Sequence, residues 1–305
     1  MIGAHLAERL LMQGHEVVLF DLTYEKERFA SPFKQLLGDI TNENDMVKLP
    51  ANADIVVHCA AVSRAELAER QPERCMNVNV VGLDNIVRWS LKQKAIPHII
   101  FTSSREVYGN PDTLPVTELQ SRRPRSTYGR SKALGEALLA YYATSHSQPY
   151  TILRFSNVYG SVHDIPERVV PTFVRNALSR LPLTVFGGEQ VLDFVFIGDA
   201  IDGVIRLMEA IRRGREEVCN VAYNICSGRG ISIGEVARLT KAACASDSEI
   251  RSLESREFDA KAFIGDYSKA RADLEYGPSM SFEDGLSLYL SKLRRQESGI
   301  DRRTK

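Results

Sequence analysis

The stretch that decides the fold class is HIIFTSSREVYG, residues 98–109, in which an apolar run ends in two serines. A second apolar run, DIVVH, occupies residues 54–58. Strands that are apolar at successive positions are buried on both faces, which is typical of a parallel sheet covered by helices. The sequence therefore predicts an α/β protein with a doubly wound parallel sheet.

Outward from this stretch, short β-branched runs alternate with longer segments of helical periodicity. We predict strands at residues 16–20, 54–58, 98–102 and 150–154. Helices are predicted between them, at residues 3–13, 73–92 and 128–145. The first half of the chain, residues 1–165, is thus interpreted as one domain built on the parallel sheet.

The second half has a looser pattern and predicts a smaller α/β region, residues 166–295, interleaved with elements that return to the sheet. Its predicted strands are residues 183–186, 193–197 and 222–226, and its predicted helices are residues 171–179, 198–212 and 233–244. The charged stretch KLRRQESGIDRRTK, residues 292–305, is interpreted as a solvated helix end, with a tail at residues 296–305.

Composition excludes several classes of protein. Lys plus Arg equals Asp plus Glu at 39 each, so net charge draws the chain neither to nucleic acid nor to a membrane. The five cysteines form no CxxC pair, which argues against a metal site and for a reducing compartment. There is no apolar run long enough for a membrane span and no signal peptide, and we predict a cytoplasmic protein.

The first residues, MIGAHLAERLLMQGHEVVLFDL, resemble the back half of a dinucleotide-binding unit. Gly3 opens a helix, and Asp21 ends the following strand at about the spacing, roughly 20 residues, of the acid that binds the adenosine ribose. A carboxylate at Asp21 would repel a 2′-phosphate and therefore selects NAD over NADP.

A complete unit of this kind also has a strand and two more glycines before Gly3. In the usual strand order that strand is central, so its loss leaves two neighbours with unpaired edges. We expect a mis-assigned start or a fragment rather than a natural variant.

Catalytic chemistry is indicated most strongly by YGRSK, residues 128–132. Tyr128 and Lys132 share one helix face at i and i+4. A phenol titrates near pH 10, and a neighbouring cation favours its phenolate, so we expect Tyr128 to act as a base near neutrality. Ser103 and Ser104 follow a buried strand, where α/β proteins bind ligands, although turn capping explains serines there equally well.

These motifs resemble the extended short-chain dehydrogenase/reductase family, in its sugar-nucleotide epimerase/dehydratase branch, close to UDP-glucose 4-epimerases. The similarity extends from residue 1 to about residue 290. Matching segments are GDI at 38–40, HCAA at 58–61, NVNVVG at 77–82, SSREVYG at 103–109, YGRSK at 128–132, RFSNVYG at 154–160, DFVFIGDA at 193–200 and YNICSG at 223–228.

The resemblance implies a Rossmann fold, NAD as cofactor and a nucleotide sugar as substrate. It implies that Tyr128 removes the C4 hydroxyl proton, that Ser104 shares a hydrogen bond with that hydroxyl, and that Glu106 is a further acid or base. Implied cofactor contacts are Gly3, Asp21, Asp39, Ile40, Ala60, Ala61, Asn79, Ser103, Tyr128 and Lys132. Implied substrate contacts are Ser104, Asn157 and Arg256. His58, on an apolar strand end, is interpreted as a packed core residue.

Two departures leave the reaction open. The 4,6-dehydratases of the family carry an Asp-Glu pair where this chain has Arg105 and Glu106, so the acid that protonates a departing hydroxyl is missing. Many members carry an arginine at the position of Leu192, where it pairs with the substrate diphosphate; Arg256 or Arg175 would have to compensate. We therefore predict a C4 epimerase, with a decarboxylase or 4,6-dehydratase as alternatives.

Two further hypotheses concern the class of protein and its assembly. A non-enzymatic NAD-binding regulator on the same fold, or an inactive fragment, is an alternative to an enzyme, but such regulators commonly lack the tyrosine–lysine pair. The family resemblance also implies a homodimer, with the helices over residues 79–91 and 132–142 as the candidate four-helix seam.

Overall fold

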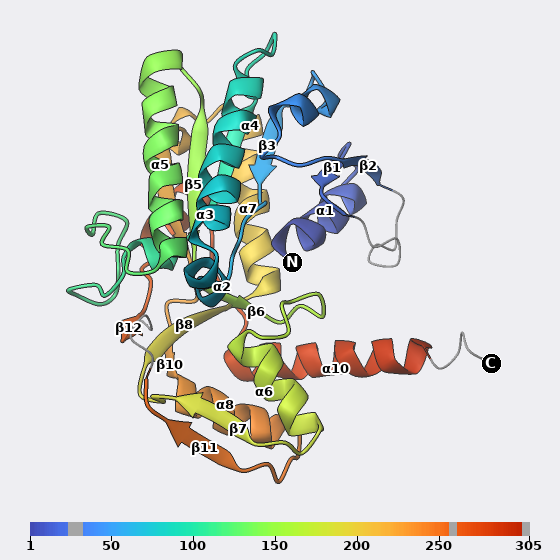
Figure 1. The fold of residues 1–305 in the computed structure, drawn as a ribbon, viewed down its shortest axis with the longest axis vertical. Helices are drawn as coiled ribbons and strands as arrows, with labels where there is room; N and C mark the ends of the chain where they lie inside the picture. The colour runs from blue at the N-terminus through green and yellow to red at the C-terminus, as the bar shows by residue number, and fades with distance from the viewer. Residues whose placement is uncertain (24–32, 256–260, 301–305) are drawn as a thin grey trace.

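The computed structural model describes residues 1–23, 33–255 and 261–300, with side chains to residue 296. A larger lobe holds the N-terminal half, and a smaller lobe lies beyond one end of its sheet (Figure 1). In the described residues no helix is long and apolar enough to cross a bilayer.

The core of the larger lobe is a parallel sheet in the order β3 (Ile55–His58), β4 (His98–Ser104), β5 (Tyr150–Phe155) and β9 (Val221–Ile225). Ile99, Ile100 and Phe101 of β4 are completely buried, as an apolar central strand requires. Because the strands are parallel, their carboxyl ends all meet at the edge that faces the smaller lobe.

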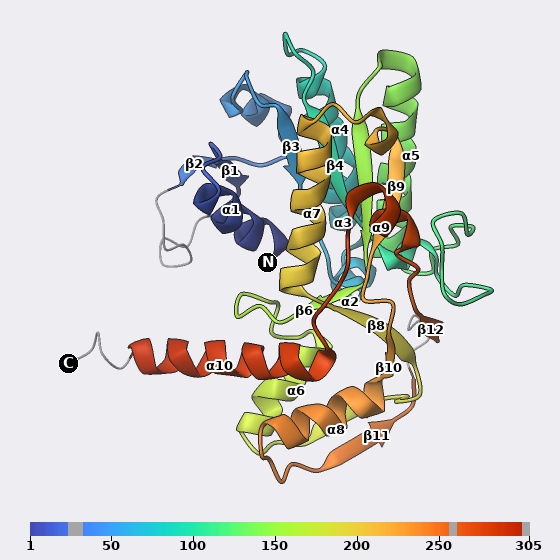
Figure 2. The ribbon, with the colours of Figure 1, turned by 180° about the vertical axis from the view of Figure 1, so that it is seen from behind.

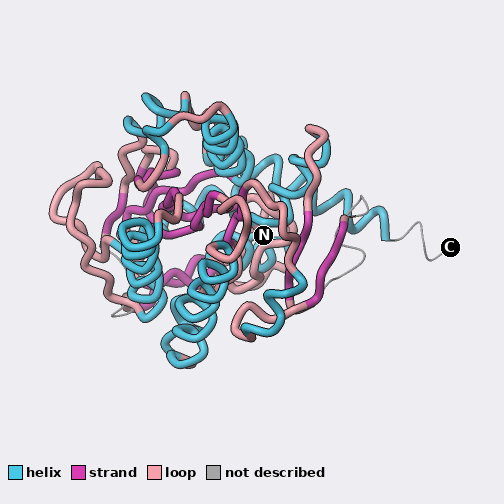
Figure 3. Tube along the Cα trace, turned by 90° about the horizontal axis from the view of Figure 1, so that it is seen from above, coloured by secondary structure: helices cyan, strands magenta, loops and turns pink. Residues whose placement is uncertain are grey.

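Helices cover both faces of this sheet. On one face lie α3 (Pro72–Met76), α4 (Gly82–Ser90) and α5 (Thr127–His146), and a wider helical turn at Asn77–Val81 joins α3 to α4. The other face carries α7 (Ile197–Arg212) and α9 (Ser268–Leu274) (Figure 2). Seen from above, the strands lie between the two helical layers (Figure 3). The predicted doubly wound α/β fold is confirmed.

The parallel strands divide into two sheets, and the division lies between the two strands whose facing edges the sequence predicted to be unpaired. β1 (Val18–Asp21) pairs only with β2 (Lys34–Leu37), in parallel, and among the described residues no hydrogen bonds join β1 to β3. Helix α1 (Ile2–Met12) packs on α7 beside this pair. The facing edges of β1 and β3 border a large cavity, described below.

The smaller lobe is built around β8 (Val191–Phe196). This strand pairs with β6 (Asn157–Tyr159), β10 (Gly230–Ser232) and β12 (Ala262–Phe263), and a separate parallel pair joins β7 (Leu183–Phe186) to β11 (Ile250–Leu253). Its helices are α6 (Val169–Leu178), α8 (Ile233–Ala243) and α10 (Phe282–Ile300). In the larger lobe, a short helix α2 (Ala65–Arg70) follows β3. Sequence patterns missed β2, β6, β10, β11, β12 and α9, most of which are too short to show a period.

A buried carboxylate joins the smaller lobe to the main sheet. Asp193 Oδ1 accepts hydrogen bonds from Ser156 Oγ at 3.0 Å and Ser227 N at 2.8 Å, and Oδ2 accepts from Gly228 N at 2.8 Å and Gly265 N at 3.3 Å. Burial raises the pKa of Asp193, and these donors oppose that effect. Three chain segments that are distant in sequence are thus hydrogen-bonded to one side chain.

We predict that Asp193→Ala lowers the free energy of unfolding by roughly 3–5 kcal/mol, because several buried donors lose their acceptor. Asp202→Ala removes a half-exposed carboxylate that pairs with Arg206 on α7 and is the matched control, with an expected loss below about 1 kcal/mol. Denaturant unfolding measures both. Equal losses in the two variants would contradict the role of Asp193.

Candidate active site

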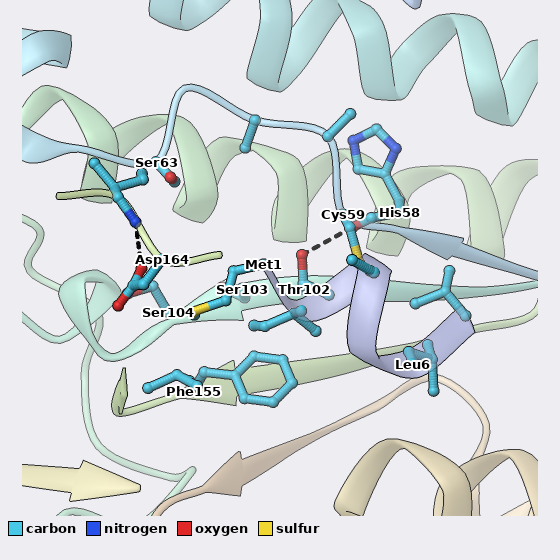
Figure 4. Close-up of a pocket in the computed structure, with 18 of the residues that line it drawn as sticks. Met1, Leu6, His58, Cys59, Ser63, Thr102, Ser103, Ser104, Phe155 and Asp164 are labelled. Atoms are coloured by element: carbon cyan, nitrogen blue, oxygen red, sulfur yellow. Dashed lines mark hydrogen bonds between the residues drawn. The ribbon is translucent and has the colours of Figure 1, made fainter. Parts of the chain in front are cut away.

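A cavity of about 1000 Å³ opens between the β1 and β3 edges and the smaller lobe. Residues from both lobes line it, and Figure 4 shows Met1, Cys59, Ser103, Ser104 and Asp164 around it. Pockets of this size at the carboxyl ends of parallel strands are the usual ligand sites of α/β proteins. The candidate residues were therefore located relative to this cavity.

The carboxyl end of β4 forms one wall. Thr102 Oγ1 donates to the His58 carbonyl at 2.8 Å and ties β4 to β3 (Figure 4). Ser104 Oγ accepts from Glu106 N at 3.2 Å and also hydrogen-bonds Tyr128. Ser104 therefore both caps a turn and faces the cavity. The structural and the functional interpretations of this serine are compatible with each other.

Helix α5 lies against this wall because small residues face it. A Cβ on Gly129 would lie 2.7 Å from the Glu106 carbonyl oxygen, and one on Gly135 would lie 2.7 Å from the Phe101 ring. Ser126 caps the helix by accepting from Gly129 N at 3.0 Å. The first turn of α5 is thereby held beside Ser104, with Tyr128 and Lys132 both lining the cavity as predicted.

A buried network behind the serines was missed from the sequence. Glu136, on α5 and 1% exposed, accepts from Ser103 Oγ at 2.6 Å and Arg154 Nη2 at 2.7 Å. Arg154 Nε and Arg122 Nη1 donate to the same carboxylate at 3.0 and 2.9 Å. The sequence signals were the placement of Glu136 one helical turn after Lys132 and of Arg154 at the start of RFSNVYG, but no local pattern pairs these two residues, which are 18 positions apart.

The protonation states of the central pair differ from our expectation. Burial raises the pKa of Tyr128 to about 12, although Arg168 and the Ser104 hydrogen bond oppose this. Burial also lowers the pKa of Lys132 to about 8. The Lys132 ammonium lies 4.6 Å from the Phe101 ring centroid and 6.0 Å from that of Tyr128. In this structure the lysine alone does not bring the phenol near neutrality.

Arg168, at the start of α6, is a cavity residue that the sequence did not reveal. Its Nη1 donates to Asp164 at 3.2 Å and its Nη2 to Ser63 Oγ at 3.3 Å. It favours the phenolate of Tyr128 more than any other nearby charge. No motif marks it, since its role follows from how the smaller lobe lies on the sheet.

Four of the predicted cofactor residues outside β4 and α5 line the cavity: Gly3, Asp21, Ala60 and Ala61. Asp39 and Ile40 are not part of the described lining, and Asp39 Oδ1 is occupied by Thr41 N at 2.8 Å.

Asn79 lies elsewhere than the resemblance implied. It is completely buried, its Oδ1 accepts from Val62 N at 2.7 Å, and its Nδ2 donates to Ser131 Oγ at 2.8 Å. This amide is occupied and lies off the cavity lining, so we correct its role to positioning the loop after β3 against α5.

The donor set fits a dinucleotide. The Lys132 side chain is 1% exposed and lies over the rings of Phe101 and Tyr128, and no hydrogen bond joins its ammonium to another described residue, which leaves its hydrogens for hydroxyl oxygens such as those of a ribose. Asp21 is exposed at the end of β1, at the same cavity, with a carboxylate available to a second ribose. The N-terminus of α1 also faces this space.

The residues predicted to bind substrate have different outcomes. Asn157 lines the cavity, and its Oδ1 accepts from Arg105 Nε at 3.1 Å. Arg256 lies outside the described residues. Leu192 lines the cavity as an apolar residue, whereas Arg175 is exposed, lies off the lining and donates to the Pro166 carbonyl.

His58 behaves as the packed residue that was predicted. Its ring stacks on Phe101 with centroids 5.9 Å apart, and burial lowers its pKa to about 3. His98, at the start of β4, is also buried, hydrogen-bonds Thr151 Oγ1 at 2.8 Å and has a pKa lowered to about 4. Both imidazoles are therefore neutral in the folded protein near pH 7.

Comparison with known proteins gives one consistent result. Residues 1–226 match the NAD dependent epimerase/dehydratase family. The chain is 31% identical to the UDP-N-acetyl-alpha-D-glucosaminuronate decarboxylase of Bacillus cytotoxicus, over 97% of this chain and 96% of that protein.

Two solved structures share its fold over nearly their whole length. The UDP-glucose 4-epimerase of Thermotoga maritima, solved with UDP-glucose, has a TM-score of 0.89 at 28% identity, covering 97% of this chain and 96% of that one. The UDP-glucuronic acid 4-epimerase of Bacillus cereus, in complex with UDP-glucuronic acid and NAD, has a TM-score of 0.87 at 27% identity, covering 96% of each chain.

The two buried histidines predict a loss of stability in acid. Below about pH 6.5 the unfolded chain binds protons that the folded imidazoles refuse, so the free energy of unfolding falls as the pH falls. We expect a loss of about 2 kcal/mol per histidine between about pH 7 and pH 5. Denaturant unfolding at several pH values measures it.

His58→Gln and His98→Gln should each remove the part of this pH dependence that comes from the replaced histidine. The exposed His146→Gln is the control and should leave it unchanged. An acid dependence that survives the double replacement in full would exclude the two histidines as its cause.

Proposed function

This chain belongs to the NAD-dependent epimerase/dehydratase family, and on that premise we propose that it is a nucleotide-sugar epimerase acting at C4 of the sugar. It is an NAD-dependent enzyme, as the sequence predicted, and the alternative of a non-enzymatic regulator is set aside. The observation that carries the proposal is the convergence of Ser104, Tyr128 and Lys132 on one cavity at the carboxyl end of β4.

In the proposed mechanism Tyr128 is the base and later the acid. Its phenol oxygen takes the proton of the C4 hydroxyl as that carbon is oxidised to a ketone, and returns the proton when the carbon is reduced on its other face. Ser104, hydrogen-bonded to Tyr128, holds the same hydroxyl oxygen. NAD, when bound, would supply the hydride acceptor and donor, and its positive charge would favour the phenolate. The sugar is isomerised without net oxidation.

The remaining residues hold and orient the cofactor and the catalytic groups. Lys132 would bind ribose hydroxyls and add positive charge near the phenol, while Asp21 would bind the adenosine ribose. Glu136 and Arg154 keep β4 and α5 together and act through their neighbours. We propose that residues 1–165 carry the cofactor and contact the reacting end of the sugar, and that residues 166–295 form the rest of the substrate-binding region, in a cytoplasmic protein.

The alternatives on the same scaffold share the first oxidation. A decarboxylase or a 4,6-dehydratase would need a further acid or base, for which Glu106 is available at the cavity. Its carboxylate is held by Arg105 Nη2 at 2.9 Å and Ser126 Oγ at 3.2 Å. Because Arg105 stands where a dehydratase carries its acid, the epimerase is favoured over the dehydratase. Product mass separates them, since only epimerisation leaves it unchanged.

We predict that Tyr128→Phe lowers turnover of the nucleotide sugar by roughly 10²-fold or more, because the proton then has no acceptor, while NAD affinity changes little. Nuclear magnetic resonance of the sugar product and fluorescence titration with NAD measure the two quantities. Tyr267→Phe removes a hydroxyl that accepts from Arg271 Nη2 at 2.7 Å and lies off the described cavity lining, and it should leave turnover unchanged. Full activity in Tyr128→Phe would exclude this mechanism.

We also propose a homodimer through α4 and α5. Leu134 and Tyr141 are 50% and 58% exposed and lie with Leu138 on one stripe of α5, and Val81 is exposed beside it. Leu134→Glu is expected to give a monomer by light scattering, because a charge would be buried in the seam. Leu119→Glu replaces a loop residue that is 96% exposed, and this variant should remain a dimer. A monomeric parent protein would refute the seam.

A further inference from the structure

Two buried hydrogen-bond donors at the cavity have no acceptor among the described residues. Arg105 is 8% exposed, and its Nη1 has no partner, although Nε donates to Asn157 Oδ1 at 3.1 Å and Nη2 pairs with Glu106 Oε1 at 2.9 Å. Asn157 Nδ2 is also buried and without a partner. Native proteins rarely leave buried donors unpaired, so both point to a bound acceptor.

The two donors belong to one rigid unit. The Nε to Oδ1 hydrogen bond fixes the amide beside the guanidinium, Glu106 fixes the second edge, and the Arg105 guanidinium carbon lies 5.8 Å from the Phe263 ring centroid. Both residues line the cavity. A positioned guanidinium with a free N–H recognises oxyanions, because charge-assisted bonds to carboxylate or phosphate are roughly twice as strong as neutral ones.

The position of this unit indicates which part of the substrate it meets. Arg105 directly follows Ser104, the residue that hydrogen-bonds Tyr128, so its backbone is attached to the reacting end of the cavity. A group on the sugar carbon next to C4 reaches this end more readily than the diphosphate does. C5 of a hexose carries C6, which is a hydroxymethyl group in hexoses and a carboxylate in hexuronic acids.

We propose that Arg105 and Asn157 bind the C6 carboxylate of a nucleotide-linked hexuronic acid, which makes a UDP-hexuronate the preferred substrate class. This inference rests on the proposed function, since it places the sugar by the Tyr128 phenol. One carboxylate oxygen accepts from Arg105 Nη1 and the other from Asn157 Nδ2, which satisfies both unpaired donors. A neutral hydroxymethyl group has one oxygen and can satisfy only one of them.

The test measures binding, which is independent of turnover. UDP, UDP-glucose and UDP-glucuronate are titrated by calorimetry into the NAD-loaded full chain in a Tyr128→Phe background, so that no ligand is converted. We expect UDP-glucuronate to bind at least about tenfold more tightly than UDP-glucose, the difference between a charged and a neutral hydrogen-bonded contact. Arg105→Gln should abolish this preference and leave UDP affinity unchanged.

In Arg105→Gln the Glu106 carboxylate loses its arginine partner, and the variant could misfold. A second variant therefore tests the carboxylate contact separately from folding. Asn157→Asp keeps the acceptor for Arg105 Nε but replaces the free donor with a negative charge. It should remove the preference for UDP-glucuronate while the thermal unfolding temperature is retained. Arg238→Gln, at an exposed pair with Glu235 on α8, is the control and should leave the preference intact.

Three results would overturn the proposal. The first is equal affinity of the parent for UDP-glucose and UDP-glucuronate. The second is equal weakening of all three ligands by Arg105→Gln, which would assign the arginine to the diphosphate. The third is a preference that survives in Asn157→Asp. Failure of the proposed function looks different: the protein with Tyr128 intact would convert neither sugar, whatever its binding preference.

Discussion

The site depends on the contact between the end of β4 and the first turns of α5. Gly129 and Gly135 allow the helix to approach, and the buried Glu136 carboxylate holds it there through Ser103 and Arg154. A charge buried this deeply is tolerated only because two arginines and a hydroxyl satisfy it. Any displacement of α5 would separate Tyr128 from Ser104, so the catalytic geometry is a consequence of this packing.

The same burial determines the electrostatics of the cavity. It raises the pKa of Tyr128 to about 12 and lowers the pKa of Lys132 to about 8, so the lysine alone does not make the phenol a base at neutral pH. Positive charge from Arg168 and from a bound nicotinamide acts in the direction that activates the phenol. In the proposed mechanism, deprotonation of the sugar hydroxyl would therefore depend on the oxidised cofactor, which would limit proton transfer to complexes that can react.

The cavity also gains volume from the separation of β1 and β3. Their facing edges share no hydrogen bonds, and residues from both strands line the space together with the start of α1. Asp21, Ala60 and Ala61, which are proposed to contact the cofactor, lie along this side. Arg105 follows β4, and Asn157 and Arg168 belong to the smaller lobe, so different parts of the chain line the two sides of the cavity.

The sequence by itself determined the parallel α/β fold, most long helices and strands, the family, the cofactor, and the presence of Tyr128 and Lys132 on one helix face. All of these are carried by local periodicity or by short motifs, which neighbouring residues encode. Only the tertiary structure decided the burial of Asn79, the partners of Glu136, the approach of Arg168, and the unpaired donors of Arg105 and Asn157. These depend on desolvation and on contacts between segments that are not adjacent in the sequence, such as Arg105 with Asn157, which are 52 residues apart. A one-dimensional pattern records neither, because the free energy of a buried charge is set by what the fold places around it.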